Sequence, residues 1–164
     1  MDVLNESESC AKGPAILRDG FCWPLARIAQ AMMGLLNVAL ADQGLTMRSF
    51  AVLAMVGHGS ARSQLEIAQT VGLDKSTLVA TIDELERRGL VERRPDPTDR
   101  RARIVESTAA GGKVLAQASD TVRDAEARIL ANLPRDEADR IKSSLIALLG
   151  GPLHDEATRA GSCL

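Results

Sequence analysis

Two short helices joined by a glycine turn constrain this chain more than any other feature. Ser63–Glu66 has the Ser-x-x-Glu spacing of a capping box, in which both side chains satisfy free backbone N–H groups. A helix is therefore predicted from Ser63 to about Val71. Gly72 supplies a turn, and Asp74 can cap a following helix by accepting from its first N–H groups.

The second helix of the pair is predicted to bury one apolar stripe, made of Leu78, Ile82 and Leu85. It should end at Gly89, because glycine is the usual residue at a left-handed C-terminal position. Two helices joined by a tight turn form a helix-turn-helix. The second helix of such a pair can enter the major groove of DNA.

A basic β-hairpin is predicted directly after this helix pair. Leu90–Arg94 and Arg103–Glu106 have the pattern of short strands, and Pro95–Arg101 carries the prolines and aspartates of a turn. Arg87–Arg103 holds seven arginines against three acidic residues, a local charge of +4 in a chain of net charge −2. Such a charge favours phosphate binding, because neutralised phosphates release condensed counterions. The alternative is a solvated charged hairpin without a nucleic-acid partner.

The stretch from about Leu65 to Val105 resembles the winged-helix core of the MarR (multiple antibiotic resistance regulator) family of bacterial transcription factors. Its most specific part is Asp96-Pro97-Thr98-Asp99-Arg100-Arg101, which is similar to the wing motif of that family. The resemblance implies that Asp99 orients Arg101 so that the guanidinium enters the minor groove. Narrow minor grooves concentrate negative potential and attract arginine.

The same resemblance implies DNA contacts from the helix pair. Lys75, Ser76 and Thr77 lie where the family contacts phosphates and base edges. Val79 and Ala80 stand where members often carry polar or basic residues, so one of them would touch a thymine methyl instead of guanine. The residues expected to contact double-stranded DNA are Ser63, Gln64, Lys75, Ser76, Thr77, Ala80, Thr81, Arg94, Asp99, Arg100, Arg101 and Arg103.

Apolar helices are predicted on both sides of the winged helix. Residues 16–42 have helical periodicity with Pro24 suited to a first turn, Thr46 can cap a helix over 47–57, and Thr108 can cap a long helix reaching Ile129. A last helix should cover 135–149 and bury Ile141, Leu145 and Leu148. The predicted organisation is an arm (1–14), an N-terminal dimerisation helix (15–45), a DNA-binding domain (46–107), C-terminal dimerisation helices (108–150) and a tail (151–164).

The predicted fold is mainly α, a winged helix-turn-helix with a two-stranded wing and flanking helices. These terminal helices are more apolar than one small winged helix needs, and pairing them in a homodimer, as the resemblance implies, would place two recognition helices about one DNA turn apart. A monomer that buries them on itself is the alternative. No apolar run reaches the ~18 residues that a membrane span needs, and Asp2, Glu6 and Glu8 do not suit a signal peptide. We therefore expect a cytoplasmic protein without a membrane partner.

The residue inventory argues against an enzyme. His58 and His154 are the only histidines, and no metal-ligand spacing, glycine-rich phosphate loop or nucleophilic serine motif occurs. Neither a cofactor nor a metal site is expected. Three cysteines without framework spacing do not imply disulfides.

Cys22 is the candidate for a redox signal. It lies near the predicted start of the first long helix, where an anionic thiolate would be stabilised. The organic-hydroperoxide regulators within the MarR family are similar in carrying a sensing cysteine in the first helix, and Cys10 or Cys163 would be the resolving thiol. That subgroup activates its cysteine with tyrosines, and this chain has none. Inert packing of Cys22 and a thiol peroxidase built on it are the alternatives.

A small aromatic or lipophilic ligand is the other expected signal, as the family resemblance implies. Arg27 or His58 would anchor a carboxylate, and plain core packing is the alternative for the apolar residues.

The expected function is a repressor that is released from a pseudo-palindromic operator by either signal. A protein-interaction module without DNA affinity is the remaining alternative. The pocket candidates are Trp23, Arg27, Ile28, Met32, Phe50 and Met55.

Overall fold

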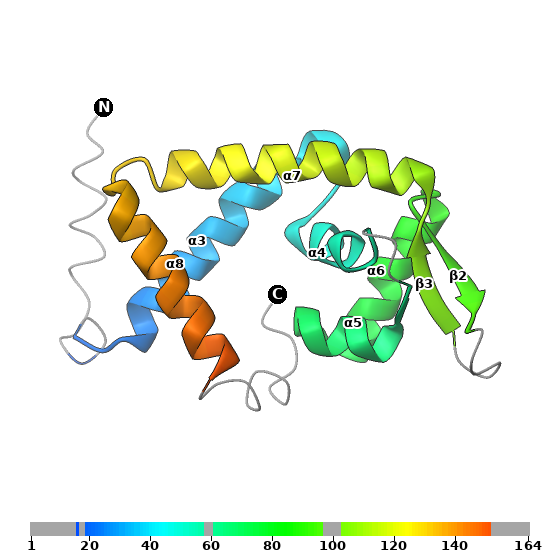
Figure 1. Cartoon of the computed structure of the whole chain (residues 1–164), viewed down its shortest axis with the longest axis horizontal. Coiled ribbons are helices and arrows are strands. Elements are labelled where there is room, and N and C mark those ends of the chain that lie inside the picture. Colours follow the sequence, from blue (N-terminus) through cyan, green and yellow to red (C-terminus); the bar gives the residue numbers. More distant parts are fainter. Residues whose placement is uncertain (1–15, 17–18, 58–60, 97–102, 152–164) are drawn as a thin grey trace. The chain divides into compact units, whose positions relative to one another are not determined.

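The computed structural model describes residues 16, 19–57, 61–96 and 103–151. The chain divides into two units, Met1–Leu35 and Leu36–Leu164, and each is described by itself. Helices dominate the described residues, as predicted, and a small antiparallel sheet forms the wing (Figure 1). In chain order the elements are α3 (Cys22–Leu40), η1 (Ala41–Gln43), α4 (Met47–Val56), β1 (Arg62–Ser63), α5 (Gln64–Val71), α6 (Lys75–Arg87), β2 (Val91–Pro95), β3 (Arg103–Ser107), α7 (Ala109–Ile129) and α8 (Arg135–Gly150).

Side-chain caps fix where four of these helices begin. At α5 the Ser63 hydroxyl accepts from the Glu66 N–H at 3.2 Å, and the Glu66 carboxylate accepts from the Ser63 N–H at 2.9 Å. The predicted caps Thr46, Asp74 and Thr108 are confirmed at α4, α6 and α7. Because each cap satisfies an N–H group that the helix itself leaves free, the local sequence determines these boundaries.

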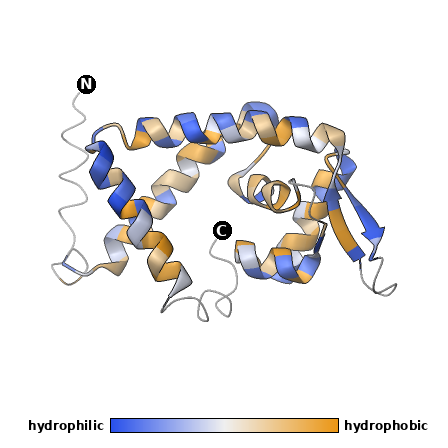
Figure 2. Cartoon of the chain, viewed as in Figure 1, coloured by the Kyte–Doolittle hydropathy of each residue, from blue (hydrophilic) through white to orange (hydrophobic). Residues whose placement is uncertain are grey.

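The core of the second unit is aliphatic, and aromatic residues make up only 2% of the sequence. Helices α4 to α7 and strands β2 and β3 contribute most of it, and Phe50 and Met55 pack against it while partly buried. In Figure 2 strand β2 is hydrophilic over most of its length, whereas β3 carries a hydrophobic stretch. The largest fully buried side chains are Leu40, Leu53, Ile67, Leu78, Ile82, Leu85, Val52, Val56, Val91 and Val105.

The sheet contains one strand more than predicted. Its order is β1-β3-β2, and both pairings are antiparallel. The short strand β1 pairs Arg62 with Val105 and Ser63 with Ile104. Two residues are too few to show an alternating pattern, so no sequence signal marked this strand.

The terminal helices do not bury all of the residues that their periodicity predicted. Helix α8 has no buried residue, and Ile141 is 47% exposed. In α3 only Leu36 and Leu40 are buried. The prediction of buried positions in α8 was therefore wrong for the single chain. An apolar stripe defines a face of a helix but does not say what covers it.

The segment Cys22–Gln43 is long and apolar enough to cross a membrane, with a mean hydropathy of 1.3. Its apolar residues are interrupted by Arg27 and Asn37, which is why no continuous apolar run appears in the sequence. A single such helix is weak evidence for a membrane span, since buried core helices of soluble proteins and N-terminal signal sequences have the same length and composition.

Two adjacent glycines in the first turn of α7 have different structural roles. A Cβ atom on Gly111 would lie 2.0 Å from the Leu90 carbonyl oxygen and 2.7 Å from the Ser107 hydroxyl. A Cβ on Gly112 would meet nothing within 4 Å. Gly111 therefore permits the close approach of α7 to the residue that precedes β2, whereas Gly112 only weakens the helix.

We predict opposite effects of alanine at these two positions. Gly111→Ala should lower the free energy of unfolding by about 1–3 kcal/mol, because backbone atoms must move to admit the methyl group. Gly112→Ala should raise it by about 0.5–1 kcal/mol, because alanine is the better helix former. Urea denaturation of both variants measures the difference. Equal midpoints would contradict the close approach at Gly111.

Candidate nucleic-acid interface

Asp74 organises the start of α6, the second helix of the helix-turn-helix. Its carboxylate accepts from the Thr77 N–H at 2.9 Å, the Ser76 hydroxyl at 2.5 Å and the Thr77 hydroxyl at 2.6 Å. These hydrogen bonds, the one from Ser76 foremost, hold the pKa of Asp74 well below its usual range. The Asp74 carboxylate therefore stays ionised at neutral pH. The hydroxyl groups of Ser76 and Thr77 donate their protons to it and cannot donate them to another group.

The outer face of α6 is open to solvent and carries both polar and small apolar side chains. Leu78, Ile82 and Leu85 are buried on the opposite face, as predicted. The Thr81 hydroxyl donates to the Thr77 carbonyl oxygen at 2.8 Å, so its proton also stays within the helix. A shallow concavity of about 640 Å³ lies along the outer face, and it is lined by Asp74, Lys75, Ser76, Val79, Ala80 and Asp83.

Arg93 on β2 joins the wing to this helix. Its guanidinium donates to Asp83 at 2.5 Å and also to Glu86, and its backbone N–H donates to Glu86 at 3.0 Å. The Arg93 side chain is only 20% exposed. One cation thus holds two helix carboxylates against the strand, which fixes the orientation of α6 relative to the wing.

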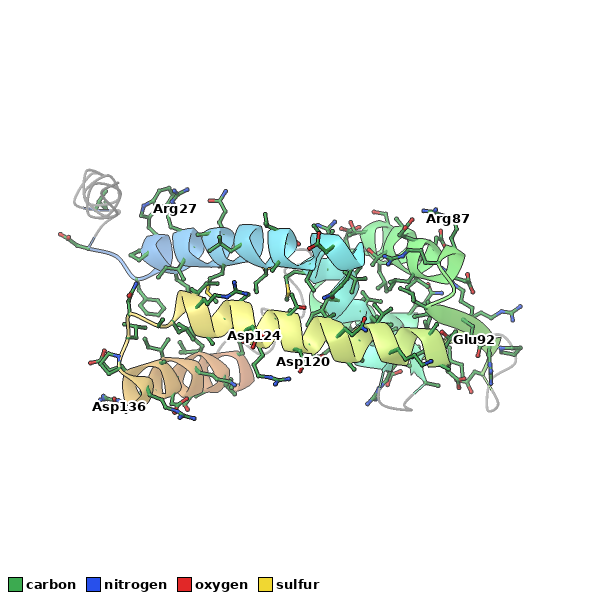
Figure 3. All side chains as sticks on the ribbon, turned by 90° about the horizontal axis from the view of Figure 1, so that it is seen from above. Arg27, Arg87, Glu92, Asp120, Asp124 and Asp136 are labelled. Carbon is green, nitrogen blue, oxygen red and sulfur yellow. The ribbon has the colours of Figure 1, made fainter. Side chains whose placement is uncertain are left out.

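Other arginines of the basic segment also have partners within the chain. Arg88 donates to the Gln43 carbonyl oxygen at 2.8 Å and to that of Gly44. Arg87 pairs with Glu84, and Arg94 lies between Glu92 and Glu106. The hydrogen bond that Arg94 donates to Glu92 raises the pKa of Arg94, followed by the charges of Glu92 and Glu106. In Figure 3 the labelled Arg87 and Glu92 point away from the ribbon. The net positive field of this segment is therefore weaker than its arginine count suggests.

The remaining predicted DNA-contacting residues occupy the expected elements. Ser63 and Gln64 stand at the start of α5, and exposed Lys75 opens α6. Arg103 is exposed at the start of β3, and in the described part of the chain no ion pair engages it. Asp99, Arg100 and Arg101 lie outside the described residues.

The predicted signal-binding residues fall in both units. Cys22 is the first residue of α3 and is exposed, and it lines a shallow hollow of about 360 Å³ with Phe21 and Trp23. Arg27 donates to the Gln30 side chain at 3.1 Å. His58 lies outside the described residues. Ile28 and Met32 belong to the first unit, and Phe50 and Met55 to the second.

The described ranges contain no group of three His, Cys, Asp or Glu side chains that could hold a metal ion. The sequence did not reveal the three residues that hold α6 against β2, namely Asp83, Glu86 and Arg93. No pattern signals them, because the helix and the strand meet only after the turn at Gly89 has set their angle.

Arg93→Ala should destabilise the protein more than Arg94→Ala does. Removing Arg93 leaves two carboxylates without their partner, and we expect the free energy of unfolding to fall by about 1–2 kcal/mol. Arg94 is more exposed, at 56% of its side chain, so its loss should leave the unfolding midpoint nearly unchanged. Urea denaturation of the two variants tests this. Indistinguishable midpoints would show that Arg93 does not brace α6.

Comparison with known proteins identifies the family of this chain. A model described as "MarR family" matches residues 43–102, from the end of η1 to the residue before β3. The chain is similar to the transcriptional repressor CouR bound to a 23-mer DNA duplex, with 33% identity, a TM-score of 0.75, and coverage of 80% of this chain and 94% of that one.

Two further solved structures are similar over most of their length. CouR from Rhodococcus jostii RHA1 bound to p-coumaroyl-CoA shares 29% identity, with a TM-score of 0.74 and coverage of 83% of this chain and 96% of that one. A cysteine-to-serine mutant of MarR from E. coli complexed with operator DNA shares 25% identity, with a TM-score of 0.70 and coverage of 91% and 99%. With a capped and braced α6, a β2–β3 wing and these relatives, the chain belongs to the MarR family of transcriptional regulators.

Proposed function

We propose that this protein is a cytoplasmic, homodimeric repressor that binds a pseudo-palindromic operator and is released by a small-molecule or oxidant signal. The observation that carries the proposal is the exposed outer face of α6, in a chain 33% identical to a repressor solved on DNA. The second helix of a helix-turn-helix reads the major groove, and the wing reaches the adjacent backbone or minor groove.

The contacts proposed for DNA are of two kinds. Lys75 and Arg103 are exposed cations on α6 and β3, and each suits a phosphate. Arg101 is assigned to the minor groove by its resemblance to the wing motif of the family. Arg94 would have to leave Glu92 and Glu106 in order to bind phosphate, so we expect it to contribute less.

The homodimer is supported by apolar surface on the terminal helices. In α3, Ile28 is 57% exposed and Val38 is 76% exposed, and in α8 Ile146 is 60% exposed and Leu149 is 57% exposed. In Figure 2 the C-terminal turns of α8 are hydrophobic. Surfaces of this kind are usually covered by a partner. A two-fold dimer would set two copies of α6 about 34–36 Å apart, one turn of DNA.

We propose an aromatic or lipophilic acid, or its coenzyme A thioester, as the first candidate for the signal. The support is that CouR has been solved with p-coumaroyl-CoA and that Trp23, Ile28, Phe50 and Met55 offer apolar surface. An organic hydroperoxide acting on Cys22 is the second candidate. Its support is the exposure of that thiol at the first turn of α3.

Arg101→Ala should weaken operator binding by about tenfold or more, because a guanidinium in a narrow minor groove is lost. The affinity should also become less dependent on salt, by about one unit of the logarithmic slope. Fluorescence anisotropy at several salt concentrations measures both. Arg123→Ala is the control of equal charge, because Arg123 lies on α7 and pairs with Asp120. The wing assignment fails if both variants bind like the wild type.

A release experiment distinguishes the two proposed signals. Peroxide should release operator DNA from the wild type but not from Cys22→Ser, if oxidation of the thiol is the signal. p-Coumaroyl-CoA or a free phenolic acid should release both proteins equally, if a ligand is the signal. Gel-shift titrations with and without reductant give the result. Equal release of both proteins by peroxide would rule out Cys22 as the sensor.

A further inference from the structure

The outer face of α6 presents few hydrogen-bond donors. The hydroxyl protons of Ser76 and Thr77 are donated to the Asp74 carboxylate, and that of Thr81 is donated to a helix carbonyl. The hydroxyl oxygen of exposed Ser76 keeps its lone pairs and can still accept. Lys75 is the only cationic side chain that lines the concavity, and it stands at the first position of the helix.

Acceptors and methyl groups occupy the rest of this face. Ala80 is exposed and Val79 is half-buried, so their methyl groups border the concavity. The Asp83 carboxylate is 59% exposed and bonds Arg93 through one oxygen, Oδ1. A duplex that lies against this face therefore meets methyl groups flanked by oxygen acceptors.

The base pairs differ in the donors, acceptors and methyl groups that they offer to such a surface. An A·T pair shows the adenine N6 amino donor and the thymine C5-methyl in the major groove. A G·C pair shows two guanine acceptors, N7 and O6, and the cytosine N4 amino donor, but no methyl group. Acceptors on the protein would pair with the amino group of adenine or of cytosine and repel the guanine edge, so they do not by themselves select an A·T pair. The thymine methyl group is the feature that separates the two pairs. Methyl groups of Val79 and Ala80 would pack on the thymine methyl.

We propose that α6 recognises A·T pairs in each half-site through contacts of Val79 and Ala80 with thymine methyl groups, while Ser76 and Asp83 accept from base amino groups beside them. Lys75 serves the phosphate backbone instead of a base. This inference rests on the proposed DNA-binding function and specifies the sequence class of the operator.

The first experiment selects operators from randomised duplexes with the full-length protein at physiological salt. We expect A·T pairs at the central major-groove positions of each half-site. Guanine selected there on either strand of both half-sites would overturn the inference while leaving DNA binding intact. Failure to select any sequence would overturn the proposed function and this inference with it.

The second experiment separates major-groove reading from the minor groove, because an arginine in the wing would also favour A·T pairs. Replacing thymine with deoxyuridine removes the C5-methyl from the major groove and leaves the minor groove unchanged. Each contacted thymine should cost roughly fourfold in affinity, the value of one buried methyl group. Equal binding of the thymine and uracil duplexes would overturn the methyl contact.

Variants connect this preference to the named side chains. In a Val79→Ala, Ala80→Gly double variant the ratio of thymine to uracil affinity should approach one. The ratio compares two duplexes on the same protein sample, so a partial loss of folded protein cancels. Lys75→Ala is the matched control, and it should weaken both duplexes alike while keeping the wild-type ratio. A double variant that keeps the full ratio would contradict the assignment to Val79 and Ala80.

Discussion

One carboxylate determines how the recognition helix begins. Asp74 caps α6 with one backbone and two hydroxyl hydrogen bonds, which sets the first turn of the helix and removes the hydroxyl protons of Ser76 and Thr77 from its surface. The same interaction that stabilises the helix therefore alters its recognition chemistry. Residues that look like donors in the sequence become acceptors in the folded protein.

The wing shows a similar difference between composition and structure. Its basic segment, Arg87–Arg103, has a net positive charge. However, Arg93 forms ion pairs with Asp83 and Glu86, and Arg94 forms ion pairs with Glu92 and Glu106. These arginines hold the helix and the strands in place. In the function that we propose, phosphate binding is then left mainly to Lys75 and Arg103. A modest net positive charge limits non-specific binding to phosphates, and fixed side chains favour specific contacts with bases.

In the function that we propose, the terminal helices link the signal to the assembly of the dimer. Exposed apolar residues on α3 and α8 support a dimer, and the exposed thiol of Cys22 with Trp23 lies in the first turn of α3. A ligand or an oxidant acting there would change a helix that we assign to dimerisation. The spacing of the two recognition helices depends on that assembly, so a change in it would alter the fit to DNA.

Helix caps, turns and the resemblance to the MarR wing were readable from the sequence alone, because each depends on residues within a few positions of one another. Ser63 with Glu66, Asp74, and Thr108 before Gly111 are examples. The tertiary structure decided the rest. The pairing of β1 with β3, the approach of Gly111 to Leu90 and the bridge from Arg93 to Asp83 join elements whose relative placement depends on the packed core. Periodicity likewise identified apolar faces on α8, but only the fold showed that the single chain leaves them uncovered.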